Sequence, residues 1–241
     1  MLSFSGLFLL TFVMLTFPIY HYSGDGMEKH RKEYVIVLHG VARGSSSMDE
    51  VAKGVESAGY EVYNLDYPST DYSFEELRDY MHQKVMALKL DTDRKVHFVG
   101  YSMGSQMIRL YLQAHRPPNL GRVVMIAPPN HGSEAADFFR DDAVFQAIFG
   151  QAGQQLGVNG VAITLPDADY DLGIVAGNRS VDPVSSAVIP GADDGKVSVE
   201  STRLKGMRDH IILPVSHLFI ITDEGAIGQV VYYLQKGRFK R

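Results

Sequence analysis

The sequence predicts an α/β protein with three layers, in which helices cover both faces of a mostly parallel sheet of about six strands. Two observations support this fold class. From residue 34 onward, short β-branched runs alternate with longer helical patterns, which is typical of βαβ units. The 241 residues are 45% hydrophobic and 21% charged, a composition that allows a large buried core and does not suit a disordered chain.

The strands and helices follow one another in a regular order. We expect strands at Tyr34–Leu38, Val62–Leu65, Val96–Val99, Val123–Ala127, Leu172–Ala176 and Ile211–Pro214. We expect helices at Met48–Ala58, Phe74–Leu90, Met103–His115 and Glu224–Lys236. The third and fourth strands are almost continuously apolar, which indicates strands that are covered on both faces. In the second helix, apolar residues recur at spacings of four, four and three and form one stripe.

One stretch, about residues 133–166, interrupts this rhythm. It contains no convincing strand and is rich in aromatic residues, among them Phe138, Phe145 and Phe149. Long connections in compact domains are usually functional or disordered, and this one is too apolar to be disordered. We therefore expect a small helical cap over a pocket that these three phenylalanines line. The alternative is an ordinary crossover helix packed on the sheet.

The chain begins with an apolar segment, residues 1–26, ahead of a body that spans residues 27–241. No charged residue occurs between Leu2 and Gly24, and the apolar run is near the lower length limit for a membrane-spanning helix. We expect an anchor, which would associate the protein with a membrane, or a signal for export, although no A-x-A cleavage pattern follows. The basic residues 29–32 favour a cytoplasmic body for an anchor. A true start at Met27 would instead give a cytoplasmic protein.

Charge and cysteine content exclude several classes of function. The net charge of −5 offers no electrostatic footprint for nucleic acid. The absence of cysteine excludes thiol catalysis, disulfides and thiolate metal sites. The sequence also lacks a P-loop and a G-x-G-x-x-G motif. We therefore expect no nucleic-acid partner, no metal and no organic cofactor.

The strongest local motif is Gly-Tyr-Ser-Met-Gly at residues 100–104, between a predicted strand and a predicted helix. A G-x-S-x-G motif in this context is typical of a sharp turn that exposes a nucleophilic serine, here Ser102. The flanking glycines allow strand and helix to approach closely, and the helix N-terminus adds partial positive charge. A chance match to a short pattern is the alternative reading.

A nucleophilic serine needs a base and an acid that orients the base. After Ser102, an acid and a histidine follow in the order Ser, Asp, His, each after a later strand. We favour Asp194 over its neighbour Asp193, because Asp194 directly precedes the turn at residues 195–196. We favour His217 over His210, because we expect His210 to precede its strand and to emerge at the other end of the sheet.

The sequence also suggests where an oxyanion would be stabilised. The backbone N–H groups of Met103, directly after the serine, and Val41, in the loop after the first strand, are the expected donors. In the same loop, we expect His39 to shape the loop and to contribute to the substrate pocket rather than to act as a second base.

Together these segments resemble the bacterial lipase and esterase branch of the α/β-hydrolase superfamily. The resemblance rests on residues 38–40, 100–104, 194–197 and 216–217, and on Pro-Pro-Asn-His-Gly-Ser at 128–133. It extends from about residue 34 to residue 233 and implies an α/β-hydrolase fold with a serine nucleophile and a covalent acyl-enzyme. The implied substrate is a small-molecule or lipid acyl ester, although one fold hosts many chemistries.

We therefore expect a serine hydrolase that cleaves carboxylic esters with Ser102, Asp194 and His217. Acyl transfer, in which an alcohol or amine replaces water, is one alternative. A non-catalytic, membrane-associated binding protein is the other, and a retained serine, aspartate and histidine argue against it.

Overall fold

The computed structural model describes residues 31–241 of the chain. The expected leader, residues 1–26, and the alternative start at Met27 lie outside this part, so the anchor, the signal and the location of the protein stay predictions. Within residues 31–241, no helix combines the length and the apolarity needed to cross a bilayer.

Six parallel strands form one sheet, in the order β2-β1-β3-β4-β5-β6. The strands are β1 (Tyr34–Leu38), β2 (Glu61–Leu65), β3 (Val96–Tyr101), β4 (Leu120–Ile126), β5 (Leu172–Gly177) and β6 (Asp209–Leu213). The predicted sheet of about six strands is confirmed. Because all strands run the same way, the loops that follow them gather at one end of the sheet.

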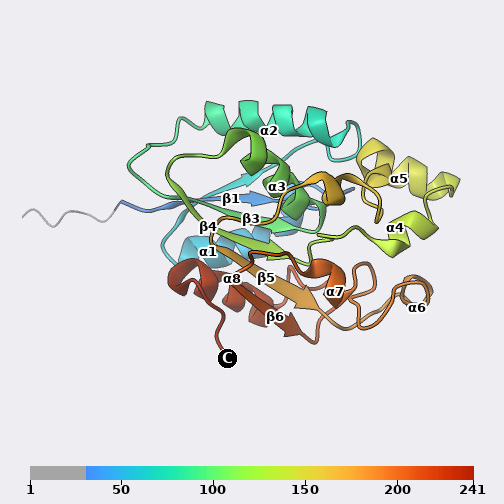
Figure 1. Cartoon of the computed structure of the whole chain (residues 1–241). Coiled ribbons are helices and arrows are strands. Elements are labelled where there is room, and N and C mark those ends of the chain that lie inside the picture. The colour runs from blue at the N-terminus through green and yellow to red at the C-terminus, as the bar shows by residue number, and fades with distance from the viewer. Residues whose placement is uncertain (1–30) are drawn as a thin grey trace, which may run out of the picture. The chain divides into compact units, whose positions relative to one another are not determined.

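Four longer helices cover the two faces of the sheet (Figure 1). On one face lie α2 (Phe74–Ala87) and α3 (Met103–His115), and on the other α1 (Asp49–Ser57) and α8 (Glu224–Lys236). The inner strand β1, next to the edge strand β2, is buried on both sides: Ile36 contributes to the core under α2 and α3, and Val37 to the core under α1 and α8. The three-layer architecture expected from the sequence is thus confirmed.

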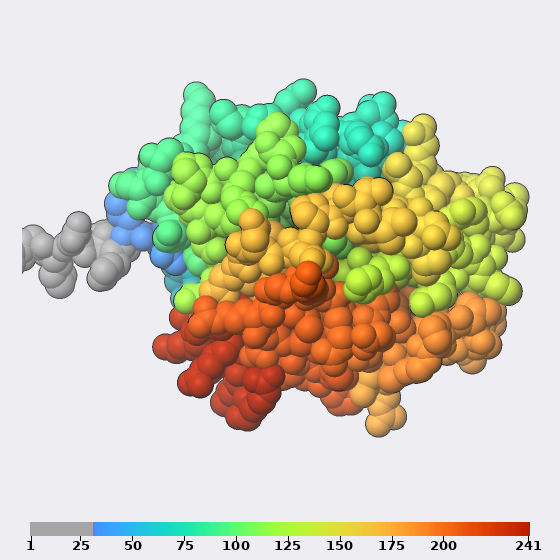
Figure 2. All heavy atoms as spheres, viewed as in Figure 1, coloured from blue at the N-terminus to red at the C-terminus, as the bar shows by residue number. Residues whose placement is uncertain are grey.

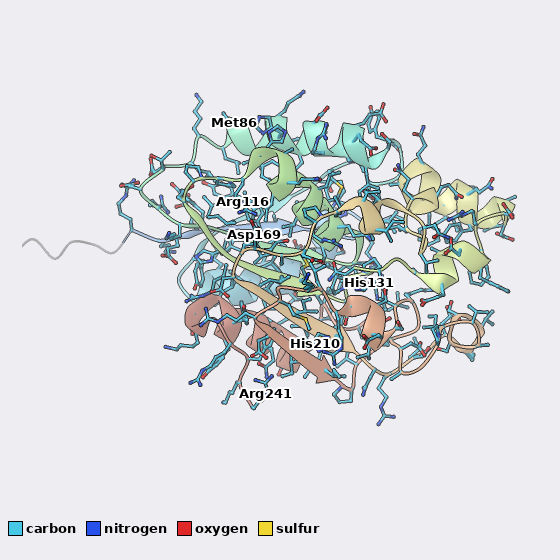
Figure 3. All side chains as sticks on the ribbon, viewed as in Figure 1. Met86, Arg116, His131, Asp169, His210 and Arg241 are labelled. Carbon is cyan, nitrogen blue, oxygen red and sulfur yellow. The ribbon has the colours of Figure 1, made fainter. Side chains whose placement is uncertain are left out.

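Several element boundaries differ from the expected ones by one to three residues, and two of these differences have a clear structural reason. β6 begins at Asp209 rather than Ile211, so His210 lies within the strand (Figure 3). β6 is an outermost strand with partly exposed side chains, which is where a sheet tolerates polar residues. The second long helix ends at Ala87, and Lys89 beyond it has a left-handed backbone (φ 51°) that stops the helix.

The segment at residues 133–166 contains three short helices at the end of the sheet where the strands terminate (Figure 1). They are α4 (Glu134–Phe138), α5 (Ala143–Gln154) and η2 (Val161–Thr164). Asp137 holds the segment together by accepting a hydrogen bond from the backbone N–H of Val158 (2.8 Å). Arg109 of α3 anchors its exit by donating to the carbonyl oxygens of Leu165 (3.0 Å) and Pro166 (3.2 Å).

The remaining short helices lie in loops. They are η1 (Ser45–Met48), α6 (Pro183–Ser186) and α7 (Val199–Thr202). Figure 2 shows the N-terminal half, in blue to green, packed against the C-terminal half, in yellow to red, over the described residues.

Candidate active site

Ser102 occupies a strained turn between β3 and α3. Its backbone has φ 52° and ψ −122°, a region that residues other than glycine seldom adopt and that stores strain at functional sites. Its N–H is fixed by a 2.8 Å hydrogen bond to the carbonyl oxygen of Ile126 in β4. The turn therefore presents the Ser102 hydroxyl at the end of the sheet where the strands terminate.

The two flanking glycines make this turn possible. A Cβ atom on Gly104 would lie 2.5 Å from the carbonyl oxygens of Leu38 and His39, and one on Gly100 would lie 2.7 Å from the backbone N of Ser105. Side chains at these positions would force α3 away from β1 and β3. The G-x-S-x-G spacing therefore reflects a close contact of backbone with backbone.

The structure brings Ser102, His217 and Asp194 together. Ser102 Oγ lies 3.1 Å from His217 Nε2, and His217 Nδ1 lies 2.7 Å from Asp194 Oδ2. All three residues are buried, with exposed fractions of 8%, 7% and 1%. In this arrangement a neutral imidazole donates its Nδ1 hydrogen to the carboxylate and accepts the serine proton at Nε2.

Hydrogen bonds distinguish the two neighbouring aspartates. Asp194 Oδ1 accepts from the backbone N–H groups of Lys196 (3.0 Å) and Val197 (2.9 Å), so its other oxygen is left to His217. Asp193 instead accepts from the Ser186 hydroxyl (2.6 Å) at the end of α6. Asp193 thus stabilises a loop and does not contact the histidine.

Tyr101 holds the backbone of His217 in place, a role that the sequence pattern does not predict. Its hydroxyl donates a 2.8 Å hydrogen bond to the carbonyl oxygen of His217, and the two rings lie 5.1 Å apart. Burial raises the pKa of Tyr101, so the hydroxyl stays a donor. The backbone N–H of His217 also donates a 2.8 Å hydrogen bond to the carbonyl oxygen of Asp194, which holds the His217 loop further.

The loop after β1 lies against the serine. A Cβ atom on Gly40 would be 3.3 Å from Ser102 Cβ, and the next residue, Val41, lines the same cavity as Ser102. Met103 is the first residue of α3, so its N–H has no partner inside the helix. These positions suit two backbone donors beside Ser102, and the oxyanion assignment to Val41 and Met103 stays a prediction.

His39 does not line the cavity, which corrects the expectation that it contributes to the pocket. Its side chain is fully buried and stacked on Tyr67, with ring centroids 4.1 Å apart. Its Nδ1 lies 2.8 Å from Gly40 O, and its Nε2 accepts from Tyr67 N (3.3 Å). Burial lowers the pKa of His39, and the neutral ring supports the loop from behind, as a loop-shaping residue does.

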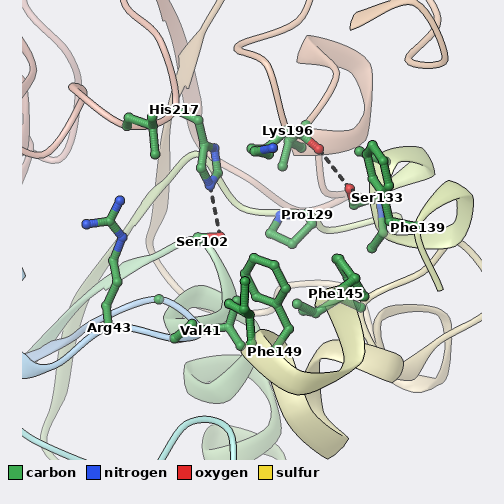
Figure 4. Close-up of a pocket in the computed structure, with 18 of the residues that line it drawn as sticks. Val41, Arg43, Ser102, Pro129, Ser133, Phe139, Phe145, Phe149, Lys196 and His217 are labelled. Atoms are coloured by element: carbon green, nitrogen blue, oxygen red, sulfur yellow. Dashed lines mark hydrogen bonds between the residues drawn. The ribbon is translucent and has the colours of Figure 1, made fainter. Parts of the chain in front are cut away.

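A cavity of about 600 Å³ opens beside Ser102 and His217 (Figure 4). Phe145 and Phe149 of α5 line it, as expected from the sequence, together with Phe139 at the end of α4. Phe138 does not: it is 59% exposed and lies outside the cavity. The short helix α4 turns Phe138 outward and brings its neighbour Phe139 to the wall.

Other histidines have structural partners elsewhere. His210 Nε2 lies 2.9 Å from the Thr202 hydroxyl, and His97 Nε2 lies 2.9 Å from a carboxylate oxygen of Glu33. Across residues 31–241, no group of three or more histidine, aspartate or glutamate side chains is arranged to hold a metal ion.

Comparisons with known proteins agree with this fold. A family model described as alpha/beta hydrolase fold matches residues 33–149, a range that includes Ser102 and ends before Asp194 and His217. Together with the six-stranded sheet, this match shows that the chain has the α/β-hydrolase fold. No curated protein sequence matches the chain.

Several solved structures have a similar fold. Lipase BlEst2 of Bacillus licheniformis, in its mature form, is 19% identical with a TM-score of 0.66, over 86% of this chain and 92% of that one. Phospholipase PlaB of Legionella pneumophila is 18% identical with a TM-score of 0.70, over 86% of this chain but only 60% of PlaB. A Paleococcus ferrophilus monoacylglycerol lipase is 16% identical with a TM-score of 0.58, over 85% and 94%. The chain is thus an α/β-hydrolase-fold protein with a lipase- and esterase-like fold.

Proposed function

We propose that this protein hydrolyses carboxylic esters with Ser102 as the nucleophile. The observation that carries the proposal is the hydrogen-bonded chain from Ser102 through His217 to Asp194 at the wall of a cavity of about 600 Å³. The names of the structural neighbours, which include lipases and a phospholipase, support an ester substrate.

The reaction begins when His217 Nε2 takes the proton of Ser102 as Oγ attacks the acyl carbonyl carbon. Asp194 holds the imidazole in the required tautomer and stabilises the imidazolium that forms. The backbone N–H groups of Val41 and Met103 would stabilise the negative charge on the carbonyl oxygen.

Collapse of the tetrahedral intermediate releases the alcohol, which takes its proton from His217. Water then attacks the acyl-enzyme with His217 again as the base, and the acid product leaves with Ser102 restored. No metal or organic cofactor enters these steps.

The cavity indicates an apolar acyl group. Three phenylalanines line one wall, namely Phe139, Phe145 and Phe149, and burial of apolar surface against them would stabilise a bound acyl chain. p-Nitrophenyl esters of increasing chain length would measure which acyl length fits best.

The decisive test is reaction with a fluorophosphonate probe, which labels activated serines. The wild-type protein should be labelled, and Ser102→Ala should lose both the label and ester hydrolysis, with kcat reduced about 10⁴-fold or more. The control is Ser216→Ala, because the Ser216 hydroxyl is buried beside His217 and has no hydrogen-bond partner in the described part of the chain. Labelling that survives in Ser102→Ala would overturn the proposal.

A further inference from the structure

Two cationic side chains, Arg43 and Lys196, line the cavity beside Ser102. The charge of Lys196 is already matched: its Nζ lies 2.6 Å from Asp182 Oδ2 and 3.2 Å from the Ser185 hydroxyl. This pairing holds the pKa of Asp182 well below its usual range. Lys196 therefore belongs to a neutral pair.

Arg43 differs from Lys196 in having no such partner. Among residues 31–241, no carboxylate lies within ion-pairing distance of its guanidinium group. The guanidinium carbon lies 5.9 Å from the centre of the Tyr101 ring, a cation–π contact that leaves the charge of Arg43 without a counter-ion. Arg43 thus brings an uncompensated positive charge to the cavity wall.

The residue before Arg43 has a positive φ, as Ser102 does. Ala42 has a φ of 54°, a left-handed conformation that is unfavourable for an alanine. The strained turn follows Val41 directly. The loop that would supply an oxyanion donor thus also directs the guanidinium group to the cavity.

Arg43 and the aromatic wall lie on different sides of the serine. In Figure 4, Arg43 is on one side of Ser102, with Phe139 and Phe145 on the other. If the acyl chain lies against the phenylalanines, the alcohol part of the ester extends toward the side that Arg43 occupies.

We propose that Arg43 binds an anionic group, a phosphate or a carboxylate, on the alcohol part of the substrate. This inference rests on the proposed ester hydrolysis and names the class of ester that the site prefers. A guanidinium group offers several N–H donors in a planar fork that matches the oxygens of either anion. Binding there would compensate the unpaired charge and orient the ester with its acyl chain toward the aromatic wall.

The test compares two soluble esters with the same butyryl group, 4-nitrophenyl butyrate and 3-butyryloxy-4-nitrobenzoate, of which only the second carries a carboxylate on its alcohol part. The measured quantity is the ratio of kcat/KM for the anionic ester to that for the neutral ester. Arg43→Gln should lower this ratio about tenfold, since a hydrogen bond to a charged group is lost. Arg43→Lys should restore part of it.

Arg238→Gln is the matched control, because Arg238 is exposed and does not line the cavity. It changes the net charge by the same amount and should leave the ratio unchanged. The wild-type ratio should also fall as salt is added, because salt screens the attraction at the cavity mouth. Thermal unfolding of each variant would measure whether the fold is retained.

A second pair of substrates identifies the source of the anion. A 1-acylglycerol 3-phosphate and the corresponding 1-acylglycerol differ only in the phosphate. If the wild type prefers the 1-acylglycerol 3-phosphate and Arg43→Gln removes this preference, the anion that Arg43 binds is a lipid phosphate. If only 3-butyryloxy-4-nitrobenzoate is preferred, the anion belongs to a small soluble alcohol.

Two results would overturn the inference. If Arg43→Gln lowers kcat/KM equally for both butyrates, Arg43 only positions Tyr101 and His217. If the ratio does not change, the charge has no role in binding. Either result leaves ester hydrolysis by Ser102 intact, whereas loss of the proposed function itself would appear as the absence of fluorophosphonate labelling in the wild-type protein.

Discussion

Charged and polar side chains are partnered differently at the two ends of the parallel sheet. At the amino end, charged side chains near the strand starts are paired. Glu61, the first residue of β2, lies 2.5 Å from Arg94, and Asp171, just before β5, lies 3.2 Å from Arg122 in β4. Arg122 and Asp171 join the neighbouring strands β4 and β5, whereas Arg94, just before β3, reaches past β1 to Glu61 in β2. Both contacts stabilise the order of the strands.

At the carboxyl end, strained backbone and an unpaired charge occur beside the hydrogen-bonded Ser102, His217 and Asp194. Ser102 has a φ of 52°, and Ala42, in the loop after β1, has a φ of 54°. Arg43 has no carboxylate nearby within the described residues.

The difference indicates where the molecule binds and reacts. Unpaired polar groups and strained backbone reduce stability and persist where function requires them, and open α/β sheets assemble their sites at the carboxyl ends of the strands. Substitutions at the two ends should therefore separate activity from stability.

The largest expected effect is at the carboxyl end. Asp194→Asn should lower kcat for ester hydrolysis about 10⁴-fold, because an amide cannot hold His217 in the tautomer that accepts the serine proton. Asp193→Asn is the matched control and should change kcat only a few-fold, since Asp193 contacts Ser186 rather than the histidine. Steady-state kinetics on a p-nitrophenyl ester measure both. Equal losses in the two variants would show that Asp194 has no special role.

The pattern of the sequence was sufficient to predict the sheet and the positions of Ser102, Asp194 and His217. The strands are buried apolar runs, and each of the three residues follows a strand. Parallel strands bring such positions to the same end, and the structure places His217 within hydrogen-bonding distance of both Ser102 (3.1 Å) and Asp194 (2.7 Å).

The details that were missed depend on contacts between distant segments. Tyr101 binds the carbonyl oxygen of His217, 116 residues away, and no local pattern encodes this contact. Phe139 lines the cavity where Phe138 was expected, and the short length of α4 explains why. The helix has only five residues, too few for periodicity to define its buried face.

The second prediction concerns the amino end. Asp171 accepts hydrogen bonds from Tyr233 (2.7 Å), Arg122 (3.2 Å) and Arg208 (3.2 Å). Asp171→Asn removes the charge that these two guanidinium groups face, so we expect the free energy of unfolding to fall by about 2 kcal/mol. The kcat should change less than twofold, because none of these residues lines the cavity. Urea unfolding and steady-state kinetics measure the two quantities.

Asp169→Asn is the matched control for this prediction. Asp169 pairs with Arg116 at the end of α3 (Figure 3), and both side chains are largely exposed. An exposed ion pair contributes about 0–1 kcal/mol, so this variant should unfold close to the wild type. If Asp171→Asn lowered activity as strongly as stability, the separation of the two ends would be wrong.

The smallest effect concerns His210, the second residue of β6. Burial lowers the pKa of His210 to about 4, below the ordinary value of about 6.5 in the unfolded chain. Between pH 6.5 and pH 4 the unfolded chain therefore binds a proton that the folded protein does not. Stability contributed by the neutral ring is complete above pH 6.5 and is lost as the pH falls toward 4.

His210→Gln should remove this part of the pH dependence. Because the ring is only partly buried, we expect the loss of unfolding free energy between pH 7 and pH 4.5 to be smaller than in the wild type by about 1 kcal/mol. His131→Gln, which replaces an exposed histidine (Figure 3), should retain the wild-type slope. Urea unfolding at the two pH values measures the difference. A wild-type slope in His210→Gln would mean that His210 titrates as it does in water, and the burial of its ring at the start of β6 would then contribute nothing to acid sensitivity.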